Sequence, residues 1–425
     1  MFEHPLLGIP LTIVVVIFWL RNQANRPQHA PAERMVVRVA PWTARVELAA
    51  LVARDPQFSE VLFLDYARMM FTRVHEERGR GNLVALGALL RPATLATLDR
   101  RGSAPTRDVV IGSARVVGLR VAGETAQIRV CFEANLSEDG VQRWVQEHWA
   151  FSRRADVASP GPEAFAALRC DQCGSALEVR TDGRCAHCGT PLADGRHLWC
   201  VEEISLTRGV ALTGLGLGQG GGVEAGTDIP THRAPDLAAQ LRALQARHPE
   251  LTLPAFEVRA REIFLRVQRA WAAGDRASLR PLETDAVFQT HRYWLDRYEK
   301  EGAANHCAAV EVTSTELARV RLDAWYTSIT LRIFATMTDW TVDRSGKVIG
   351  GSQTEPRRFS EYWTFVRAAG KPAAPRASLD TCPSCGAPLD KVGESGVCGY
   401  CDAKISTGQF DWVLAGIDQD EAYGG

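Results

Sequence analysis

Eight of the 11 cysteines occur as four Cys-x-x-Cys pairs. The pairs fall into two sets, and the two pairs of a set are separated by 11 residues in the first set and 12 in the second. Four thiolates at such a spacing can surround one tetrahedral cation, and a closed four-cysteine shell leaves no open position for water or substrate. The sequence therefore predicts two structural zinc ions, held by Cys170, Cys173, Cys185 and Cys188, and by Cys382, Cys385, Cys398 and Cys401.

The residues around these pairs are typical of zinc ribbons. Glycine follows three of the pairs, at Gly174, Gly189 and Gly386, and allows a tight turn around a metal, whereas Asp402 follows the fourth. The competing interpretation is a disulfide framework in an exported protein, which the small number of other cysteines disfavours. Those others stand singly and are expected to be small core residues: Cys131, Cys200 and Cys307.

The elements that position these cysteines are written twice in the chain. Nine residues between positions 48 and 74 recur without a gap 193 positions later: Leu48, Leu51, Arg54, Pro56, Phe63, Arg68, Phe71, Arg73 and Val74 match Leu241, Leu244, Arg247, Pro249, Phe256, Arg261, Phe264, Arg266 and Val267. Leu90 to Pro92 also recurs as Leu279 to Pro281, and Trp149-x-Phe151 as Trp363-x-Phe365. Each cysteine set is followed by a tryptophan, Trp199 or Trp412, that we expect to dock the next strand onto its domain. The sequence thus predicts two copies of one unit.

Hydrophobic periodicity changes once within each copy. Apolar residues first recur at helical spacing, as in Phe63, Met70, Phe71 and Val74 and in Phe256, Ile263, Phe264, Val267 and Trp271. They then alternate with polar residues, as in Ile128, Val130 and Phe132 and in Ile329, Leu331, Ile333, Ala335 and Met337. Helices followed by antiparallel strands predict an α+β fold.

The second copy resembles the Tim44-like domain, a member of the NTF2-like cone folds. The resemblance rests on the run from Phe264 to Trp271, Gly274-Asp275, Leu279 to Leu282, the strand from Trp325 to Asp339, and Phe359 to Phe365. It covers residues 251–368 well and residues 58–155 more weakly, and bacterial relatives with zinc ribbons look most similar. It implies a membrane-associated domain without enzymatic activity and with an apolar cleft between sheet and helices. The mitochondrial namesake tethers a chaperone motor through an N-terminal region that has no match here.

The first residues add a membrane prediction. Leu6 to Leu20 is apolar apart from Thr12, a length slightly below that of a usual spanning helix. Arg21 and Arg26 follow the run, so the positive-inside rule favours a single-pass helix in the bacterial inner membrane with the soluble domains in the cytoplasm. A signal peptide or an interfacial helix remains the alternative.

The predicted fold class is therefore α+β, with two NTF2-like (Tim44-like) cone domains, each followed by a zinc ribbon, and one transmembrane helix. The predicted boundaries are 1–22 for the helix, 23–40 for a linker, 41–157 for unit 1, 168–206 for ribbon 1 with its closing strand, 207–234 for a glycine-rich linker, 235–368 for unit 2, and 380–420 for ribbon 2 with its closing strand. Gly216-x-Gly218-x-x-Gly221 matches a dinucleotide fingerprint by letter but has no βαβ context.

Function is predicted from the apolar residues of the second copy. Five aromatic residues could line a cleft for a hydrophobic peptide or an acyl chain, or fill the core: Trp325, Tyr326, Trp340, Tyr362 and Trp363. The favoured function is a membrane-anchored scaffold or transport-associated protein without enzymatic activity, which binds protein clients or membrane components through Tim44-like clefts. Its expected partners are membrane lipid through the N-terminal helix and a protein or hydrophobic ligand. The alternative is an enzyme or a small-molecule or lipid-binding protein that uses the pocket, and an enzyme would place His291 or Asp323 in the cavity with a shifted pKa. A net charge of -1 and mixed charges in the ribbons make nucleic acid an unlikely partner.

Overall fold

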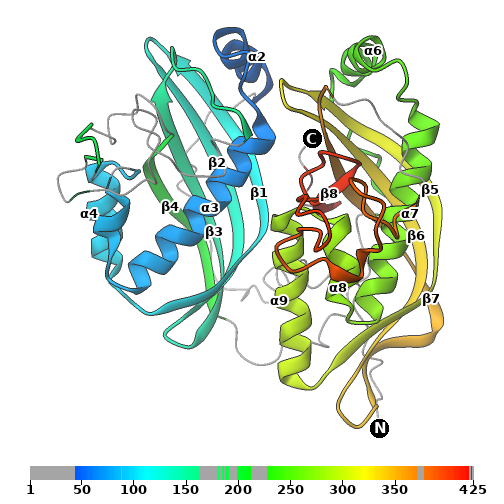
Figure 1. Cartoon of the computed structure of the whole chain (residues 1–425). Coiled ribbons are helices and arrows are strands. Elements are labelled where there is room, and N and C mark those ends of the chain that lie inside the picture. Colours follow the sequence, from blue (N-terminus) through cyan, green and yellow to red (C-terminus); the bar gives the residue numbers. More distant parts are fainter. Residues whose placement is uncertain are drawn as a thin grey trace. The chain divides into compact units, whose positions relative to one another are not determined.

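The computed structural model describes residues 44–87, 89–162, 180, 184–185, 187–190, 199–211, 227–370, 378–420 and 423. The described residues divide into two compact units. The first holds residues 44–211 together with Asp323–Trp325, and the second holds the other described residues from 227 onward. Each unit consists of helices followed by a four-stranded antiparallel sheet (Figure 1). The α+β class expected from the change of periodicity is therefore confirmed.

Among its described residues, the first unit contains three helices, one 3-10 turn and four strands. The helical segments are α2 (Ala44–Arg54), α3 (Glu60–Gly79), η1 (Leu83–Leu86) and α4 (Pro92–Arg101). The strands are β1 (Thr106–Ala122), β2 (Thr125–Glu138), β3 (Val141–Arg154) and β4 (Cys200–Ala211). They pair in the order β1-β2-β3-β4, and β4 joins the sheet only after the first cysteine set has passed.

The second unit repeats this order. Its helical segments are α6 (Leu237–Arg247), α7 (Leu253–Ala272), α8 (Arg276–Leu279), η2 (Arg280–Leu282) and α9 (Asp285–Glu301). Its strands are β5 (Ala304–Leu322), β6 (Tyr326–Val342), β7 (Val348–Ala368) and β8 (Val413–Gln419), in the order β5-β6-β7-β8, and the short η3 (Leu389–Lys391) lies in the second cysteine set. The closing strand again follows the cysteines.

The helices of the two units begin and end at positions 193 apart. This holds for both ends of α2 and α6, of α3 and α7, and of η1 and α8, and for the first residues of α4 and α9. The N-caps agree as well, because the Ser59 hydroxyl accepts from the Leu62 amide and the Thr252 hydroxyl from the Ala255 amide. The gap-free offset seen in the sequence thus extends through four elements.

One of the letter matches between the copies is out of register. Leu90 makes a parallel bridge to Val201, and Glu283, not Leu279, makes the equivalent bridge to Leu414. Because Leu90 and Glu283 are 193 apart, the Leu-Arg-Pro strings at 90–92 and 279–281 lie four residues out of alignment. The first string enters a helix, whereas the second forms η2. Equivalent positions in the two units therefore follow from the strand pairing, and the three-residue match at 90–92 and 279–281 is not an equivalence.

Each core lies between one face of the sheet and the helices. The residues that alternate inward on the middle strands are fully buried, including Ile128, Val130 and Phe132 in β2 and Ile329, Leu331 and Ile333 in β6. The apolar stripes predicted on α3 and α7 are buried against them. Figure 1 shows α3 against the first sheet and α7 with α9 against the second. The predicted helix and strand faces are confirmed.

The linker predicted at residues 207–234 is too long. Residues 207–211 belong to β4, where Ala211 still pairs with Arg143. At the other end, the Ala234 amide donates to the Ala318 carbonyl at 2.8 Å, so this part of the chain is bound to the second unit. Residues 212–226, between these two ends, lie outside the described residues.

Three further predictions fall on undescribed residues. These are the transmembrane helix at 1–22, the linker at 23–40, and the part of ribbon 1 that carries Cys170 and Cys173. Among the residues that are described, none of the helices has the length and apolar character needed to cross a membrane.

Candidate metal centre

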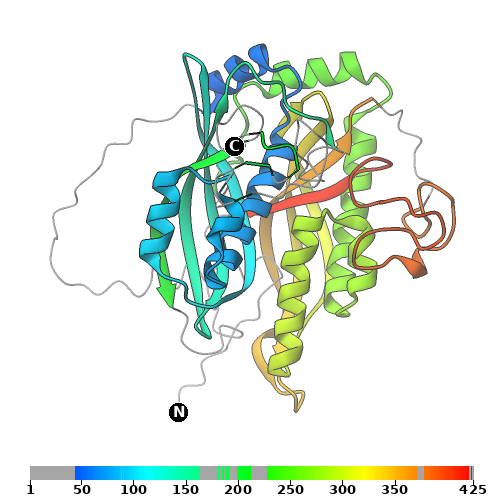
Figure 2. The same ribbon diagram turned by 60° about the vertical axis from the view of Figure 1, so that its left-hand side comes forward.

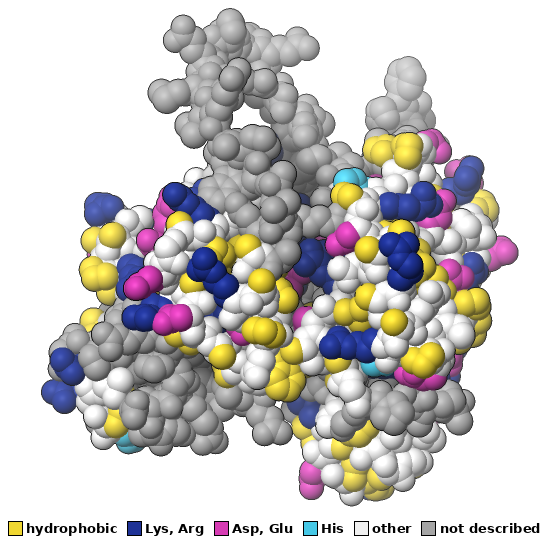
Figure 3. Space-filling view, turned by 90° about the horizontal axis from the view of Figure 1, so that it is seen from above, with side chains coloured by type: hydrophobic (Ala, Val, Ile, Leu, Met, Phe, Trp, Pro, Cys, Tyr) yellow, Lys and Arg dark blue, Asp and Glu magenta, His cyan; other side chains and the backbone are white. Residues whose placement is uncertain are grey.

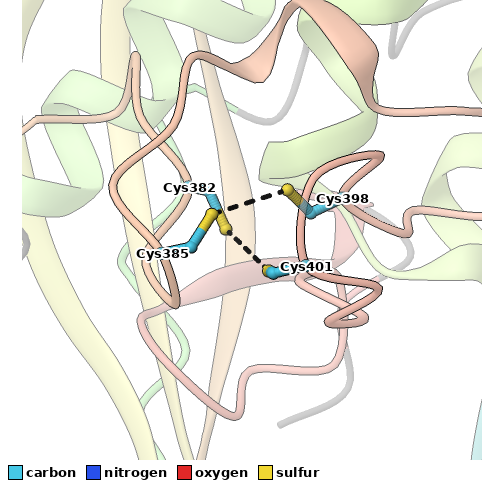
Figure 4. Close-up of side chains that lie close together, drawn as sticks. All are labelled: Cys382, Cys385, Cys398 and Cys401. Atoms are coloured by element: carbon cyan, nitrogen blue, oxygen red, sulfur yellow. Dashed lines mark hydrogen bonds between the residues drawn. The ribbon is translucent and has the colours of Figure 1, made fainter.

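The second cysteine set forms one cluster. The Sγ atoms of Cys382, Cys385, Cys398 and Cys401 all lie within 4.8 Å of one another (Figure 4). The Sγ atoms of Cys382 and Cys401 are 3.8 Å apart, and those of Cys385 and Cys398 are 4.0 Å apart. A disulfide needs about 2.05 Å, whereas a tetrahedral zinc site with Zn–S bonds of about 2.3 Å spaces its sulfurs by about 3.8 Å. The four thiols therefore fit a metal ion and not a disulfide framework.

The backbone holds the cysteines in the same turn wherever it is described. At Cys382 the amide donates to the carbonyl five residues later, and the amide four residues later donates to the Cys382 carbonyl. Cys398 and Cys185 make the same two bonds at 2.9–3.0 Å. The turn requires a left-handed residue after each pair, which is Gly189 at φ 72°, Gly386 at φ 76° and Asp402 at φ 56°. Cys185 and Cys188 of the first set thus have the turn that a ribbon needs.

The thiols differ in acidity. The pKa of Cys401 falls to about 7, in the first place because the Ala403 amide donates to its sulfur. The Ala387 amide lowers the pKa of Cys385, but desolvation and the three neighbouring thiols together outweigh it and raise that pKa to about 11. One thiolate therefore forms easily near neutral pH. A divalent cation would favour the deprotonated form of the other three as well.

The second cysteine set is bound to the helices of its own unit. The guanidinium of Arg280, 2% exposed, donates Nε to the Glu394 carbonyl at 2.7 Å and Nη2 to the Ser406 hydroxyl at 3.1 Å. Lys404 pairs with Asp285 at the first turn of α9, at 2.6 Å. Further ion pairs join Arg292 to Glu394 and Arg266 to Asp380, so the loops lie beside α7 and α9 (Figure 2). If the cysteines lost a bound metal, we expect the loops of the second set to lose their fixed conformation and Arg280 to lose its burial.

The tryptophans after the two sets dock the closing strands, as predicted. The Trp412 ring meets Phe256 edge to face at 4.7 Å, and Trp199 meets Phe63 in the same way at 5.1 Å. An arginine of the third strand covers each indole, Arg367 at 5.3 Å and Arg153 at 4.6 Å. The same three residue types therefore close both units.

Each unit also buries a glutamate that binds a neighbouring indole. The Trp149 indole donates to Glu147 at 2.7 Å, and the Trp363 indole donates to Glu361 at 2.9 Å. Glu147 has His75 at 3.3 Å and Arg101 at 2.9 Å. Burial alone would raise the pKa of Glu147, but His75, Arg101 and the indole lower it to about 2.

Sequence reasoning did not identify these glutamates. The signal was present, because the repeated Trp-x-Phe strings extend to Glu-x-Trp-x-Phe at 147–151 and 361–365. A glutamate at an inward strand position is conspicuous, since it is seldom fully buried without partners. The partners of Glu147 lie on other elements, His75 on α3 and Arg101 on α4, so the Glu-x-Trp-x-Phe motif does not reveal them.

The predicted aromatic cleft is not a single surface. Trp363, Tyr362 and their strand neighbours alternate across the sheet, so the fully buried Trp363 lies in the helix-side core and Tyr362 on the other face. Tyr362 stacks on Tyr423 at 3.8 Å, and its hydroxyl accepts from the His232 amide. Tyr326 and Trp340 point to the same face as Tyr362, and the half-buried Trp325 lies in the turn between β5 and β6. The expectation that these five residues line one cleft is wrong, because the pleat separates them.

The two residues proposed for the enzyme alternative have structural partners. His291 is buried, and its Nδ1 lies 2.6 Å from the Glu283 carboxylate, which is itself fully buried. Asp323 lies in the β5–β6 turn, where it accepts from the Trp325 amide at 2.8 Å. These contacts hold a helix and a turn in place.

Comparison with known protein families finds one match. Residues 237–376 match the model of the Tim44-like domain family. The match begins with α6, includes all of β7 and ends eight residues after that strand. This range contains residues 251–368, where the sequence resemblance was strongest. A comparison with curated proteins found no match.

Proposed function

We propose that the protein is a membrane-anchored scaffold without enzymatic activity, which binds protein clients or membrane components through Tim44-like modules. The proposal is carried by the match of residues 237–376 to the Tim44-like domain family. The domain would be the binding unit, and the ribbon would stabilise it.

We further propose that the first unit is a second module of the same kind. Its support is the common offset of the helices, the same strand order, and the shared Trp-Phe-Arg cluster at each closing strand. Two modules on one chain could hold two partners or one partner at two points, which raises the effective concentration of the second contact.

The buried glutamates have structural partners. Glu147, Glu283 and Glu361 are bound by histidine, arginine, tryptophan or glutamine side chains of their own unit.

The surface charges bear on the kind of partner. On the face shown in Figure 3, basic and acidic side chains are interspersed over the described residues. Such a surface favours protein or membrane partners over nucleic acid, which requires clustered positive charge.

We propose two zinc ions per chain, one for each cysteine set. The second site has its four thiols assembled, and the first has the matching turn at Cys185. Four-cysteine sites of this kind hold zinc structurally. The membrane anchor is proposed from Leu6 to Leu20, and an alkaline wash of membranes tests it, because release of the protein into the supernatant would contradict it.

Photocrosslinking in cells tests the client-binding function. A photoreactive residue would replace Val258, which is 69% exposed on α7, and separately Asp65, its equivalent 193 positions earlier on α3. Discrete protein adducts that appear only on illumination are expected. If both positions gave only lipid or small-molecule adducts and no protein adducts, the result would instead favour a ligand-binding protein.

A further inference from the structure

The two units differ at one carboxylate position, which is partly exposed in the first unit and buried in the second. Ile128 pairs with Phe151 and Ile329 with Phe365, so Glu138 and Asp339 occupy equivalent places ten residues further along β2 and β6. In the first unit, the buried Arg78 of α3 donates to Glu138 at 2.6 Å. Arg143 of β3 also pairs with Glu138 at 3.1 Å, so the first unit neutralises this carboxylate with two arginines.

The second unit lacks the equivalent of Arg78. The residue 193 positions after Arg78 is Trp271 of α7, whose indole donates to the Asn305 oxygen at 2.9 Å. This bond orients the Asn305 amide, whose nitrogen then donates to Asp339 Oδ1 at 2.9 Å. Asp339 is thus hydrogen-bonded to the neutral Asn305, which is itself oriented by the neutral Trp271.

The second oxygen of Asp339 is left open. Asp339 is 3% exposed, and among the described residues its Oδ2 has no hydrogen-bond partner. The nearest cation is Arg357 of β7, whose Nη1 lies 3.8 Å from Oδ2, beyond hydrogen-bond distance. An ionised carboxylate in this position would lack one of the contacts that stabilise a buried charge.

The surroundings of Asp339 shift the pKa of its carboxyl far from the ordinary value. Burial raises its pKa to about 7, against the opposing effects of Asn305 and Arg357. Asn305 on β5 and Arg357 on β7 act on it directly, and its charge acts on Tyr298 of α9 and Cys307 of β5. The next groups are Glu301 near Tyr298, Gln268 of α7 beside Cys307, and the Glu283-bound His291 beside the Trp271 ring. Burial raises the pKa of Cys307 to about 12 and that of Tyr298 further, so both stay protonated.

The strand that carries Arg357 is irregular at this point. Met337 pairs with Arg357 but Asp339 pairs with Ser352, so residues 353–356 form a bulge in β7. The equivalent pairing of β2 with β3 runs to Val141 without a shift. The bulge disrupts the ladder between β6 and β7, and its Thr354 and Glu355 amides donate to the Ser352 hydroxyl at 3.2 and 2.9 Å in place of partners on β6.

We propose that Asp339, Arg357 and the bulge at residues 353–356 form a proton-sensitive switch in the second unit. When Asp339 gives its proton to water, the charged Oδ2 draws the Arg357 guanidinium into a hydrogen bond and the bulge is held against β6. When Asp339 takes the proton back, Arg357 is released and the bulge opens. The switch does not depend on the scaffold function.

Hydrogen exchange with mass spectrometry on the full-length protein tests the switch. The amides of residues 353–355 and 357 would be followed at pH 6 and pH 8, with labelling times scaled to the intrinsic exchange rate at each pH, because residue 356 is a proline without an amide hydrogen. Protection is expected to rise about tenfold at pH 8, the ratio that one pKa unit of coupling between proton and conformation produces. Asp339→Asn is expected to abolish the rise and keep the protection seen at pH 6.

Two further variants keep the test decisive. Arg357→Gln, at a partly exposed side chain, should also abolish the rise, which covers the case that Asp339→Asn does not fold. Glu138→Gln, the matched change in the first unit, should leave the rise intact. The proposal is overturned if the wild-type bulge exchanges alike at both pH values, or if Asp339→Asn or Arg357→Gln keeps the full rise.

Discussion

Two single residues differ from the residues at equivalent positions in the other cysteine turns or in the other sheet. Asp402 takes the left-handed conformation that glycine takes at Gly189 and Gly386. Asp339 takes the place that an arginine-bound glutamate has in the first unit. Each difference isolates one physical cause.

The left-handed position after the last cysteine gives a stability prediction. Because a side chain at positive φ costs about 1 kcal/mol, Asp402→Gly should raise the free energy of unfolding of the metal-loaded second unit by about that amount. Gly386→Asp should lower it by a similar amount. Denaturant unfolding of both variants measures the effect, and equal stability of all three proteins would contradict it.

The raised pKa of Asp339 gives a prediction with a defined sign. The pKa is 3.8 for the free side chain and about 7 in the fold, so between these values the folded state binds more protons than the unfolded chain. The free energy of unfolding therefore falls as pH rises from about 4 to 7. Asp339→Asn removes this loss and should be more stable than the wild type at pH 8 by roughly 2–4 kcal/mol.

Urea unfolding at pH 5 and pH 8 measures this difference. The advantage of Asp339→Asn should shrink at pH 5, where the wild-type carboxyl is protonated. A constant advantage at both pH values would mean that the carboxyl does not titrate in this range.

At the scale of elements, the closing strand completes each sheet through one tryptophan. Trp412 and Trp199 are both less than a tenth exposed and both lie between a helix phenylalanine and a sheet arginine. Since truncation of a buried tryptophan to alanine costs about 3–5 kcal/mol, either change should detach the strand that follows.

The two units supply matched tests of this role. Trp412→Ala should lower the hydrogen-exchange protection of β8, and Trp199→Ala that of β4. Each unit has its own core, so each substitution should act mainly in its own sheet. Equal loss of protection in both sheets from a single substitution would argue against separate cores.

At the scale of the whole molecule, metal content links the cysteine sets to the stability of their units. We expect about two zinc ions per chain in the purified protein, and one in Cys385→Ser. The loops of the second set bury Arg280 and contact α9, so Cys385→Ser should also destabilise α9 and β8. Mass spectrometry of the metal content tests the first point.

Cys188→Ser is the matched control in the first set. It should also reduce the metal content to one ion per chain, but should leave α9 and β8 protected. Two bound ions in both variants would mean that these cysteines are not ligands.

Features that depend on residues close together in the chain could be predicted before folding is considered. The Cys-x-x-Cys spacing predicted a metal cluster at Cys382, Cys385, Cys398 and Cys401, and the periodicities predicted the inner faces of α7 and β6, because ligand turns and amphipathic faces are set by residues a few positions apart. The constant offset also indicated the matching helices.

Side-chain direction, strand register and the partners of buried charges became known only from the folded structure, because they depend on residues far apart in the chain. The structure separated Tyr362 from Trp363 across the sheet, replaced the Leu-Arg-Pro match by a register set through Val201 and Leu414, and gave Glu147 its partners His75 and Arg101. It also left Asp339 with the neutral Asn305 where the first unit has an arginine. Charge, burial and register are properties of pairs brought together by folding, and a single string of residues does not specify those pairs.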